Sequence, residues 1–275
     1  MTKVLGIIAA QGILPIMVSD NNASVDGRSI IACIEGLASK GDYKNHIAQE
    51  FPIGKISAII KYFKENDVKK IVICGAMKRP NFSALSVDAK GAILLAKILA
   101  AKILGDDQLL RIVAEYLEGQ GFKIVAPIDY TNQVPIKTKH APSKRESNDI
   151  ELGLKAAKIL GDLDIGQAVI VADGAVIGVE AIEGTDALIK RCAGFGKSGI
   201  LVKCLKPTQD PRLDTPVIGV DTVKAVHESG MAGIAISGVI TLNPEEVVAE
   251  ANRLGIFVIE GGISIPRRRP WGLGK

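Results

Sequence analysis

The sequence predicts an α/β fold, with an N-terminal Rossmann-like parallel-sheet domain followed by a C-terminal α/β domain. Strand-like and helix-like runs alternate along the first 130 residues, which is typical of a parallel sheet covered by helices. Hydrophobic residues make up 47% of the chain but aromatic residues only 4%, so the core must be built mainly from aliphatic side chains. The length of 275 residues exceeds the usual size of a single core and therefore favours two domains.

Each element of the first domain is predicted from the periodicity of its apolar residues. The expected strands lie at 3–10, 28–34, 70–75 and 122–126, and the expected helices lie near 14–24, 54–66, 88–103 and 107–119. The stretch 91–104 is almost uninterruptedly apolar. We assign it to the core, with a subunit contact or a lipid groove as the alternatives.

The second half continues with a helix near 148–160 and a hairpin at 167–180, whose Asp173-Gly174 pair supplies the positive φ angles of a type I′ turn. A last helix is expected to begin at the N-cap Asn243, with Pro244 in its first turn and Glu246 completing a capping box. The other predicted elements are a helix at 185–192, a strand at 199–205, a helix at 219–229, a strand-like run at 233–242 and a strand at 256–260.

The domain boundary is predicted where residues 128–148 interrupt the alternation with prolines and polar residues. We place a Rossmann-like nucleotide-binding domain at 1–130, a linker at 131–147 and a catalytic α/β domain at 148–262. The last residues, 263–275, include three consecutive arginines and are predicted to form a disordered basic tail.

Charge and cysteine usage argue against several classes of protein. The net charge is +4, and four cations within the last fifteen residues account for all of it, so the body has no excess positive charge for nucleic acid. The four cysteines form no CxxC pair and are predicted to be reduced and buried, which argues against a zinc site or a disulfide framework. Lysines interrupt the longest apolar stretch, so we expect no membrane span.

The most informative polar segment is the loop at 206–219, KPTQDPRLDTPVIG, which follows a buried strand. Open α/β sheets bind ligands at the carboxyl ends of their strands. Asp210 and Asp214 can converge on one divalent cation, while Lys206 and Arg212 can hold phosphate oxygens. Three prolines restrict the loop and lower the cost of ordering it. The alternative is a rigid surface loop with solvated charges.

A second acidic segment, Glu183-Gly184-Thr185-Asp186, lies where the hairpin gives way to a helix. The start of a helix offers free N–H groups to a phosphate, and Glu183 and Asp186 can bind a cation. Ordinary capping by Thr185 is the alternative. Tertiary folding could gather these carboxylates with those of the 206–219 loop. Oxygen ligands without histidine point to Mg²⁺ or Mn²⁺.

The nucleotide-binding signals of the first domain are weaker. Lys78 and Arg79 follow a strand, where they can clamp a diphosphate or simply lie in solvent. The first turn, within residues 6–15, lacks the GxGxxG pattern, which disfavours NAD. Asp106, at the start of a predicted helix, is explained by N-capping alone.

These segments, in this order, resemble a known family over roughly residues 3–260. The matching blocks are GIIA and GILP within 6–15, FPIG at 51–54, KRP at 78–80, GDD at 105–107, EGTDA at 183–187 and the whole 206–219 pattern. The chain resembles the I-type UDP-2,3-diacylglucosamine pyrophosphatases of the lipid A pathway. One departure is Ala10-Gln11 before Gly12, where family members carry additional glycine.

The resemblance implies a cytoplasmic, Mg²⁺-dependent hydrolase that converts UDP-2,3-diacylglucosamine into UMP and 2,3-diacylglucosamine 1-phosphate. Peripheral contact with the inner membrane and a homodimer are open expectations. Asp210 and Asp214 would bind the metal, and Glu183 or Asp186 would serve as a further ligand or base. The substrate-binding residues that we expect are Gln11, Gly12, Lys78, Arg79, Thr185, Lys206, Gln209 and Arg212.

Two other functions stay open at this point. The first is a nicotinamide-dependent oxidoreductase built on the Rossmann-like half, and the missing glycine pattern disfavours it. The second is a noncatalytic nucleotide-sugar sensor, which would not need paired carboxylates. Release of UMP from a UDP-sugar lipid would separate the enzyme from the sensor.

Overall fold

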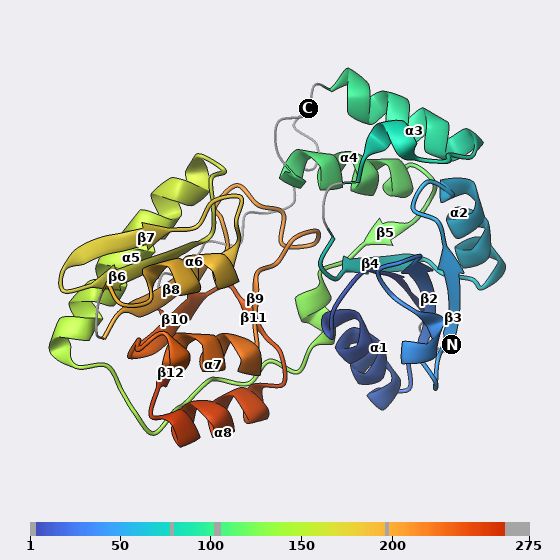
Figure 1. Ribbon diagram of the computed structural model, residues 1–275. Coiled ribbons are helices and arrows are strands. Elements are labelled where there is room, and N and C mark those ends of the chain that lie inside the picture. Colours follow the sequence, from blue (N-terminus) through green and yellow to red (C-terminus); the bar gives the residue numbers. More distant parts are fainter. Residues whose placement is uncertain (1–3, 78–79, 102–105, 196–197, 262–275) are drawn as a thin grey trace, which may run out of the picture. The chain divides into compact units, whose positions relative to one another are not determined.

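A computed structural model describes residues 4–77, 80–101, 106–195 and 198–261 (Figure 1). The chain divides into two compact units. The first comprises Met1–Gln133 together with the short segment Gln209–Thr215, and the second comprises Val134–Thr208 together with Pro216–Lys275. The predicted basic tail and the Lys78-Arg79 pair lie outside the described residues.

The first unit alternates strands and helices, as the sequence predicts, and adds a short strand, β3, that the sequence analysis missed. Its strands are β1 (Val4–Ala9), β2 (Arg28–Ile34), β3 (Ile47–Phe51), β4 (Lys70–Cys74) and β5 (Lys123–Ile124). Its helices are α1 (Leu14–Ser24), α2 (Ile56–Glu65), α3 (Ala89–Ala100) and α4 (Asp106–Glu118), with 3₁₀ turns η1 (Lys40–Asp42), η2 (Phe82–Ala84) and η3 (Pro127–Tyr130).

The sheet of the first unit is entirely parallel, with the strand order β3-β2-β1-β4-β5. Alternate residues of β2 point to opposite faces. Ile30, Ala32 and Ile34 join a core with α2, α3 and α4, whereas α1 packs against β1 and β2 on the other face (Figure 1). The result is a sheet with helices on both faces, which is the Rossmann-like arrangement that the alternation predicts.

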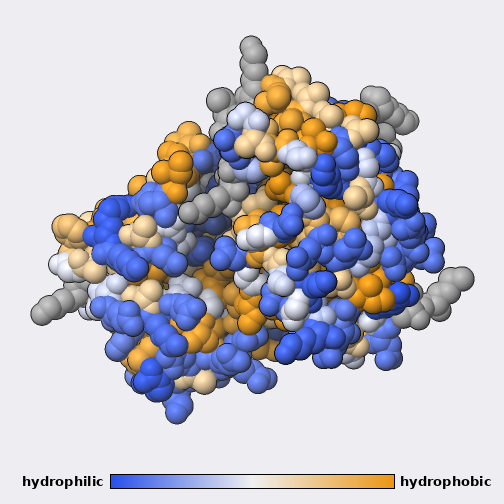
Figure 2. Space-filling view, turned by 45° about the vertical axis from the view of Figure 1, so that its right-hand side comes forward, coloured by the Kyte–Doolittle hydropathy of each residue, from blue (hydrophilic) through white to orange (hydrophobic). Residues whose placement is uncertain are grey.

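Over its described residues, 91–101, the apolar stretch assigned to the core is buried on one side only, and residues 102–104 lie outside the described part of the chain. Leu94 and Ile98 of α3 pack inward, but Ile93 is 53% exposed and Leu99 is 61% exposed. Hydrophobic residues accordingly gather at the top of the view in Figure 2, where α3 lies. The assignment of the whole stretch to the core is therefore wrong for this outer side of the helix.

Over its described residues, the second unit contains a five-stranded sheet and four helices. Its strands are β6 (Ala168–Ala172), β7 (Ala175–Val179), β8 (Ile200–Cys204), β10 (Gly233–Ser237) and β12 (Phe257–Glu260), with the short pair β9 (Val217–Ile218) and β11 (Ile240–Thr241) forming a separate ladder. Its helices are α5 (Lys144–Asp162), α6 (Thr185–Cys192), α7 (Val220–Glu228) and α8 (Pro244–Leu254).

The second sheet has the order β12-β10-β8-β6-β7 and is mixed. Strand β6 runs antiparallel to both of its neighbours, while β8, β10 and β12 are parallel. Helix α5 packs on one face, and α6, α7 and α8 cover the other (Figure 1). Asp173 and Gly174 both have positive φ, which confirms the predicted turn of the β6–β7 hairpin.

Two helix starts in the second unit differ from the predictions. Helix α5 begins earlier, because Ser143 and Glu146 form a reciprocal capping box that the sequence analysis overlooked. Asn243 does not cap α8 with its side chain. Its backbone is left-handed, with φ 47°, and its amide donates to Glu246 Oε1 at 3.2 Å instead.

The four cysteines are free and buried, as predicted. Burial raises the pKa of the Cys33 thiol to about 11, with the charges of Glu50 and Asp42 adding to the effect, and burial raises that of Cys204 to about 12. These thiols are therefore protonated and inert at neutral pH. Among the described residues, no helix is both long enough and apolar enough to cross a membrane.

Candidate active site

The first unit places Gln11 and Gly12 where a ligand would be expected. They follow the carboxyl end of β1. The strand order places β1 beside β4, and successive strands are added in one direction from β1 to β3 and in the opposite direction from β4 to β5. Ligands bind at such switch points in open α/β sheets. The backbones of Gln11 and Ala76 exchange hydrogen bonds of 3.1 and 2.7 Å, which ties the turn after β1 to the turn after β4.

Gly75 allows these two turns to approach each other closely. Its φ is +105°, and a Cβ atom at this position would lie 2.6 Å from the carbonyl carbon of Ala10. Only glycine combines this backbone conformation with the required space. The exposed side chain of Gln11 is thus presented from a turn whose backbone is fixed on both sides.

The acidic loop belongs to the first unit, although the sequence analysis placed it in the second domain. Leu213 is 6% exposed and joins the core built on β2, β4 and the helices of the first unit. Arg212 Nη1 donates to Glu118 Oε1 at 2.9 Å, and the backbone N–H of Asp210 donates to Asp107 Oδ1 at 3.4 Å. These contacts attach the loop to α4.

Asp210 is held by Arg212 through several hydrogen bonds. The Arg212 Nε donates to Asp210 Oδ1 at 3.1 Å, and Nη2 donates to Oδ2 at 2.7 Å. Burial alone would raise the pKa of the Asp210 carboxyl, but its hydrogen bonds from Arg212 and the nearby positive charges of Arg212 and Arg111 outweigh burial and lower it. Asp210 is therefore ionised at neutral pH.

Asp214 is oriented by a neighbour in the same loop. The side-chain amide of Gln209, a residue only 6% exposed, donates to Asp214 Oδ2. At the other end of the loop, Lys206 belongs to the second unit, and its Nζ lies 2.8 Å from Asp164 Oδ1. Both cations predicted to hold phosphate oxygens, Lys206 and Arg212, are therefore paired with protein carboxylates.

The second acidic segment lies at the start of α6 in the second unit. Gly184 has φ +81°, which directs the chain from the strand β7 region into the helix. Glu183 accepts a hydrogen bond from Arg191 Nη2 at 2.8 Å, and this bond is the main reason why the pKa of its carboxyl is lowered. Asp186 lies exposed in the first turn of α6.

Sequence reasoning missed a buried polar network next to this segment. Lys203 Nζ donates to Thr185 Oγ1 at 3.0 Å, and the Thr185 hydroxyl donates to Glu180 Oε1 at 2.6 Å. Lys203 and Glu180 are 7% and 5% exposed. The only signal in the sequence was a lysine within an otherwise apolar strand. The sequence analysis also missed Asp107, whose carboxylate accepts the hydrogen bond from the Asp210 backbone in the acidic loop. In the sequence it looked like an ordinary residue at the start of a helix.

The predicted metal ligands fall into two pairs, one in each unit. Asp210 and Asp214 belong to the first unit, and Glu183 and Asp186 belong to the second, so their convergence on one ion stays a prediction. Over the described residues, no group of three or more acidic, histidine or cysteine side chains is placed to hold a metal ion. The donors near Asp210 nevertheless suit Mg²⁺, which usually takes one or two carboxylates together with substrate phosphates and water.

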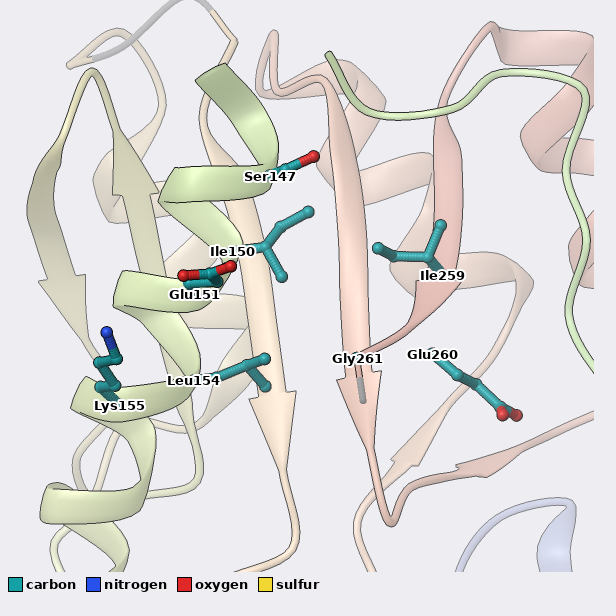
Figure 3. Close-up of a pocket in the computed structure, with 8 residues that line it drawn as sticks. All are labelled: Ser147, Ile150, Glu151, Leu154, Lys155, Ile259, Glu260 and Gly261. Carbon is teal, nitrogen blue, oxygen red and sulfur yellow. The ribbon is translucent and has the colours of Figure 1, made fainter. Parts of the chain in front are cut away.

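A cavity of about 390 Å³ lies elsewhere in the second unit, between α5 and the edge strand β12 (Figure 3). Ile150 and Leu154 from α5 and Ile259 from β12 supply its apolar wall, and Glu151 and Glu260 lie at its sides (Figure 3). No residue of the predicted site lines it. The cavity is therefore separate from the candidate residues at the start of α6.

These features define a class of protein: an α/β protein of two units, with a Rossmann-order sheet and an acidic loop braced by arginine. The LpxI N-terminal domain profile matches residues 4–134, and the LpxI C-terminal domain profile matches residues 134–259. The chain is also 32% identical to the UDP-2,3-diacylglucosamine pyrophosphatase LpxI of Caulobacter vibrioides, over 97% of this chain and 99% of that protein. The chain belongs to the LpxI family.

A solved structure with a detectable likeness is that of CobK precorrin-6A reductase. The alignment covers 94% of this chain and 87% of that chain, with 11% sequence identity and a TM-score of 0.30.

Proposed function

We propose that the protein hydrolyses the diphosphate bond of UDP-2,3-diacylglucosamine, giving UMP and 2,3-diacylglucosamine 1-phosphate. The observation that carries this proposal is the match to the Caulobacter pyrophosphatase, which extends over both domains and almost the full length of both chains. Because the named substrate carries two acyl chains, the protein would act at a membrane surface, which the family resemblance implies is the cytoplasmic side of the inner membrane.

The proposed site uses the acidic loop of the first unit. Asp210 and Asp214 would hold Mg²⁺, whose charge polarises a phosphoryl oxygen and lowers the pKa of bound water. Arg212 is neutralised by Asp210 and Glu118, so we assign it the task of orienting Asp210 in place of the anion-binding role expected from sequence. Gln209 would orient Asp214 in the same way.

The remaining residues would bind the substrate or tune its surroundings. Gln11 and Gly12 at the switch point of the first sheet would meet the nucleotide, together with Lys78 and Arg79. In the second unit, Thr185 would meet the headgroup, and Lys206 would do so only by exchanging its contact with Asp164 for the substrate. Glu183 or Asp186 would supply a further metal ligand or accept a proton from the attacking water.

The proposal is tested by measuring UMP release from UDP-2,3-diacylglucosamine dispersed in detergent. We expect release with Mg²⁺, loss of release after chelation, and recovery when Mg²⁺ is restored. Asp214→Asn should lower kcat about 100-fold, whereas Asp162→Asn, at an exposed position in the last turn of α5, should leave kcat unchanged.

Each outcome bears on a different part of the proposal. Binding of the substrate without any release of UMP would indicate a sensor and would overturn hydrolysis. Release that survives thorough chelation would remove the metal ion but leave the hydrolase. An unimpaired Asp214→Asn variant would remove Asp214 from the site.

A further inference from the structure

Lys203 is a buried cation of the second unit that has no part in the mechanism proposed above. It is the fourth residue of β8 and is only 7% exposed. Leu201 lies two residues earlier on the same face of the strand and packs in the apolar cluster with residues of α6 and α7. An ammonium group in such surroundings is costly unless hydrogen-bond acceptors compensate its lost hydration.

Two acceptors of Lys203 come from separate segments of the chain. Lys203 Nζ donates to Thr185 Oγ1 and to the backbone carbonyl of Val217, each at 3.0 Å. The Thr185 hydroxyl donates in turn to Glu180 Oε1 at 2.6 Å, and Glu180 Oε2 accepts from the backbone N–H of Gln167 at 2.9 Å. The Thr185 hydroxyl thus accepts a hydrogen bond from the Lys203 ammonium and donates one to the Glu180 carboxylate. Both hydrogen bonds are charge-assisted, and together they fix the orientation of the hydroxyl.

The two segments held by Lys203 are the ones that flank the candidate acidic residues. Thr185 is the first residue of α6 and directly precedes Asp186. Val217 opens β9 just after Pro216, where the chain re-enters the second unit from the acidic loop. A displacement of either segment would therefore move groups assigned to the site, and displacements of about 1 Å can cost 100-fold in rate.

We infer that Lys203 is a positioning residue for the hydrolysis, acting through the Thr185 hydroxyl and the Val217 carbonyl without touching the substrate. The inference rests on the proposed function. The inference requires that loss of the Lys203–Thr185–Glu180 network lowers kcat by more than the accompanying loss of stability explains. The network includes a buried carboxylate, Glu180, and this allows the two contributions to be separated.

The experiment compares Lys203→Met with the double variant Lys203→Met/Glu180→Gln, by UMP release and by thermal unfolding. Lys203→Met removes the cation that is linked to the buried Glu180 carboxylate through the Thr185 hydroxyl. We expect a lower Tm and a kcat about 10- to 100-fold lower, with little change in KM. Glu180→Gln removes the unbalanced charge, so the double variant should regain Tm but not kcat.

One further variant completes the comparison. Lys190→Met removes an exposed lysine from α6 and should leave both kcat and Tm unchanged.

A double variant whose kcat recovers together with Tm would overturn the inference, because Lys203 would then serve folding alone. The same conclusion follows if Lys203→Met keeps full kcat. If Lys203→Met does not fold, the double variant decides alone. Wild-type protein that releases no UMP would instead overturn the proposed function, and the role of Lys203 with it.

Discussion

Asp210 and Arg212 are two residues apart, yet their pairing depends on a third residue far along the chain. The Arg212 guanidinium also donates to Glu118, so one cation is shared by two carboxylates. This arrangement holds Asp210 ionised and fixes the direction of its carboxylate. An ion that binds here would therefore meet a carboxylate that is already charged and oriented.

The lowered pKa of Asp210 predicts a pH-dependent contribution to stability. A carboxyl group whose pKa is lower in the folded state stabilises the fold above its unfolded pKa, near 3.9, and loses this effect as pH falls through the folded pKa. Asp210→Asn should therefore lower the free energy of unfolding by about 1 kcal/mol above roughly pH 5, a small value because Arg212 is 40% exposed.

The measurement is urea unfolding of both proteins between roughly pH 3 and 7. The difference between wild type and Asp210→Asn should be constant near neutral pH and shrink below roughly pH 4. A difference that grows as the pH falls would show that the pKa of Asp210 is raised in the folded state, contrary to the structure.

The candidate acidic residues could be predicted because their pattern is local. Asp210, Arg212 and Asp214 lie within five positions between a strand and a helix, where polar residues gather at the edge of a sheet. Their partners are not local: Glu118 is 94 positions from Arg212, and Asp107 is 103 positions from Asp210. Spacing alone carries no information about such pairs, so Asp107 looked like an ordinary helix start.

Most helices and buried strands could be predicted from periodicity, and helix α6 was predicted with its observed bounds. The missed strands are β3, where only Phe51 is buried, and β9, which has two residues. A strand that buries so few side chains has no alternating apolar pattern to reveal it. The prediction for Asn243 was wrong in the opposite way. The sequence carries a helix-capping signature, but the Asn243 backbone is left-handed and its side chain does not cap α8.

The turn after β4 provides a test at the level of secondary-structure elements. Gly75→Ala would place a methyl group 2.6 Å from the backbone of Ala10, in addition to the strain of a residue with φ +105°. Gly36→Ala, where φ is +78° and no atom lies within 4 Å of the added carbon, isolates the strain alone.

We expect Gly36→Ala to cost about 1 kcal/mol of unfolding free energy and Gly75→Ala about 1–3 kcal/mol more because of the clash. Denaturant unfolding of the two variants measures this difference. Equal losses in both variants would mean that the turns after β1 and β4 do not need their close approach.

At the scale of the whole molecule, the path of the chain is interleaved. The segment Gln209–Thr215 lies between two runs of the second unit in sequence but groups with the first unit in space. Leu213 anchors it by packing in the core of the first unit. The sequence could not predict this exchange, since a single leucine in a polar loop does not indicate which of two apolar cores will bury it.

The interleaved path predicts which of the two units a mutation in the acidic loop destabilises. Leu213→Ala should destabilise the first unit by about 2–5 kcal/mol, the usual cost of a cavity left by a buried leucine. The matched control is Leu188→Ala, which removes a fully buried leucine from the core of the second unit. Because the two variants are expected to destabilise different units, amide hydrogen exchange resolved by residue is the appropriate measurement.

Leu213→Ala should speed exchange in β1, β2 and β4, and Leu188→Ala should speed exchange in β6 and β8. If Leu213→Ala instead left β1, β2 and β4 protected, Leu213 would not belong to the core of the first unit. The attachment of Asp210 and Asp214 to that unit would then depend on polar contacts such as those of Arg212 and Asp107. These contacts are a weaker anchor, because charged pairs near the surface contribute less to stability than a buried leucine.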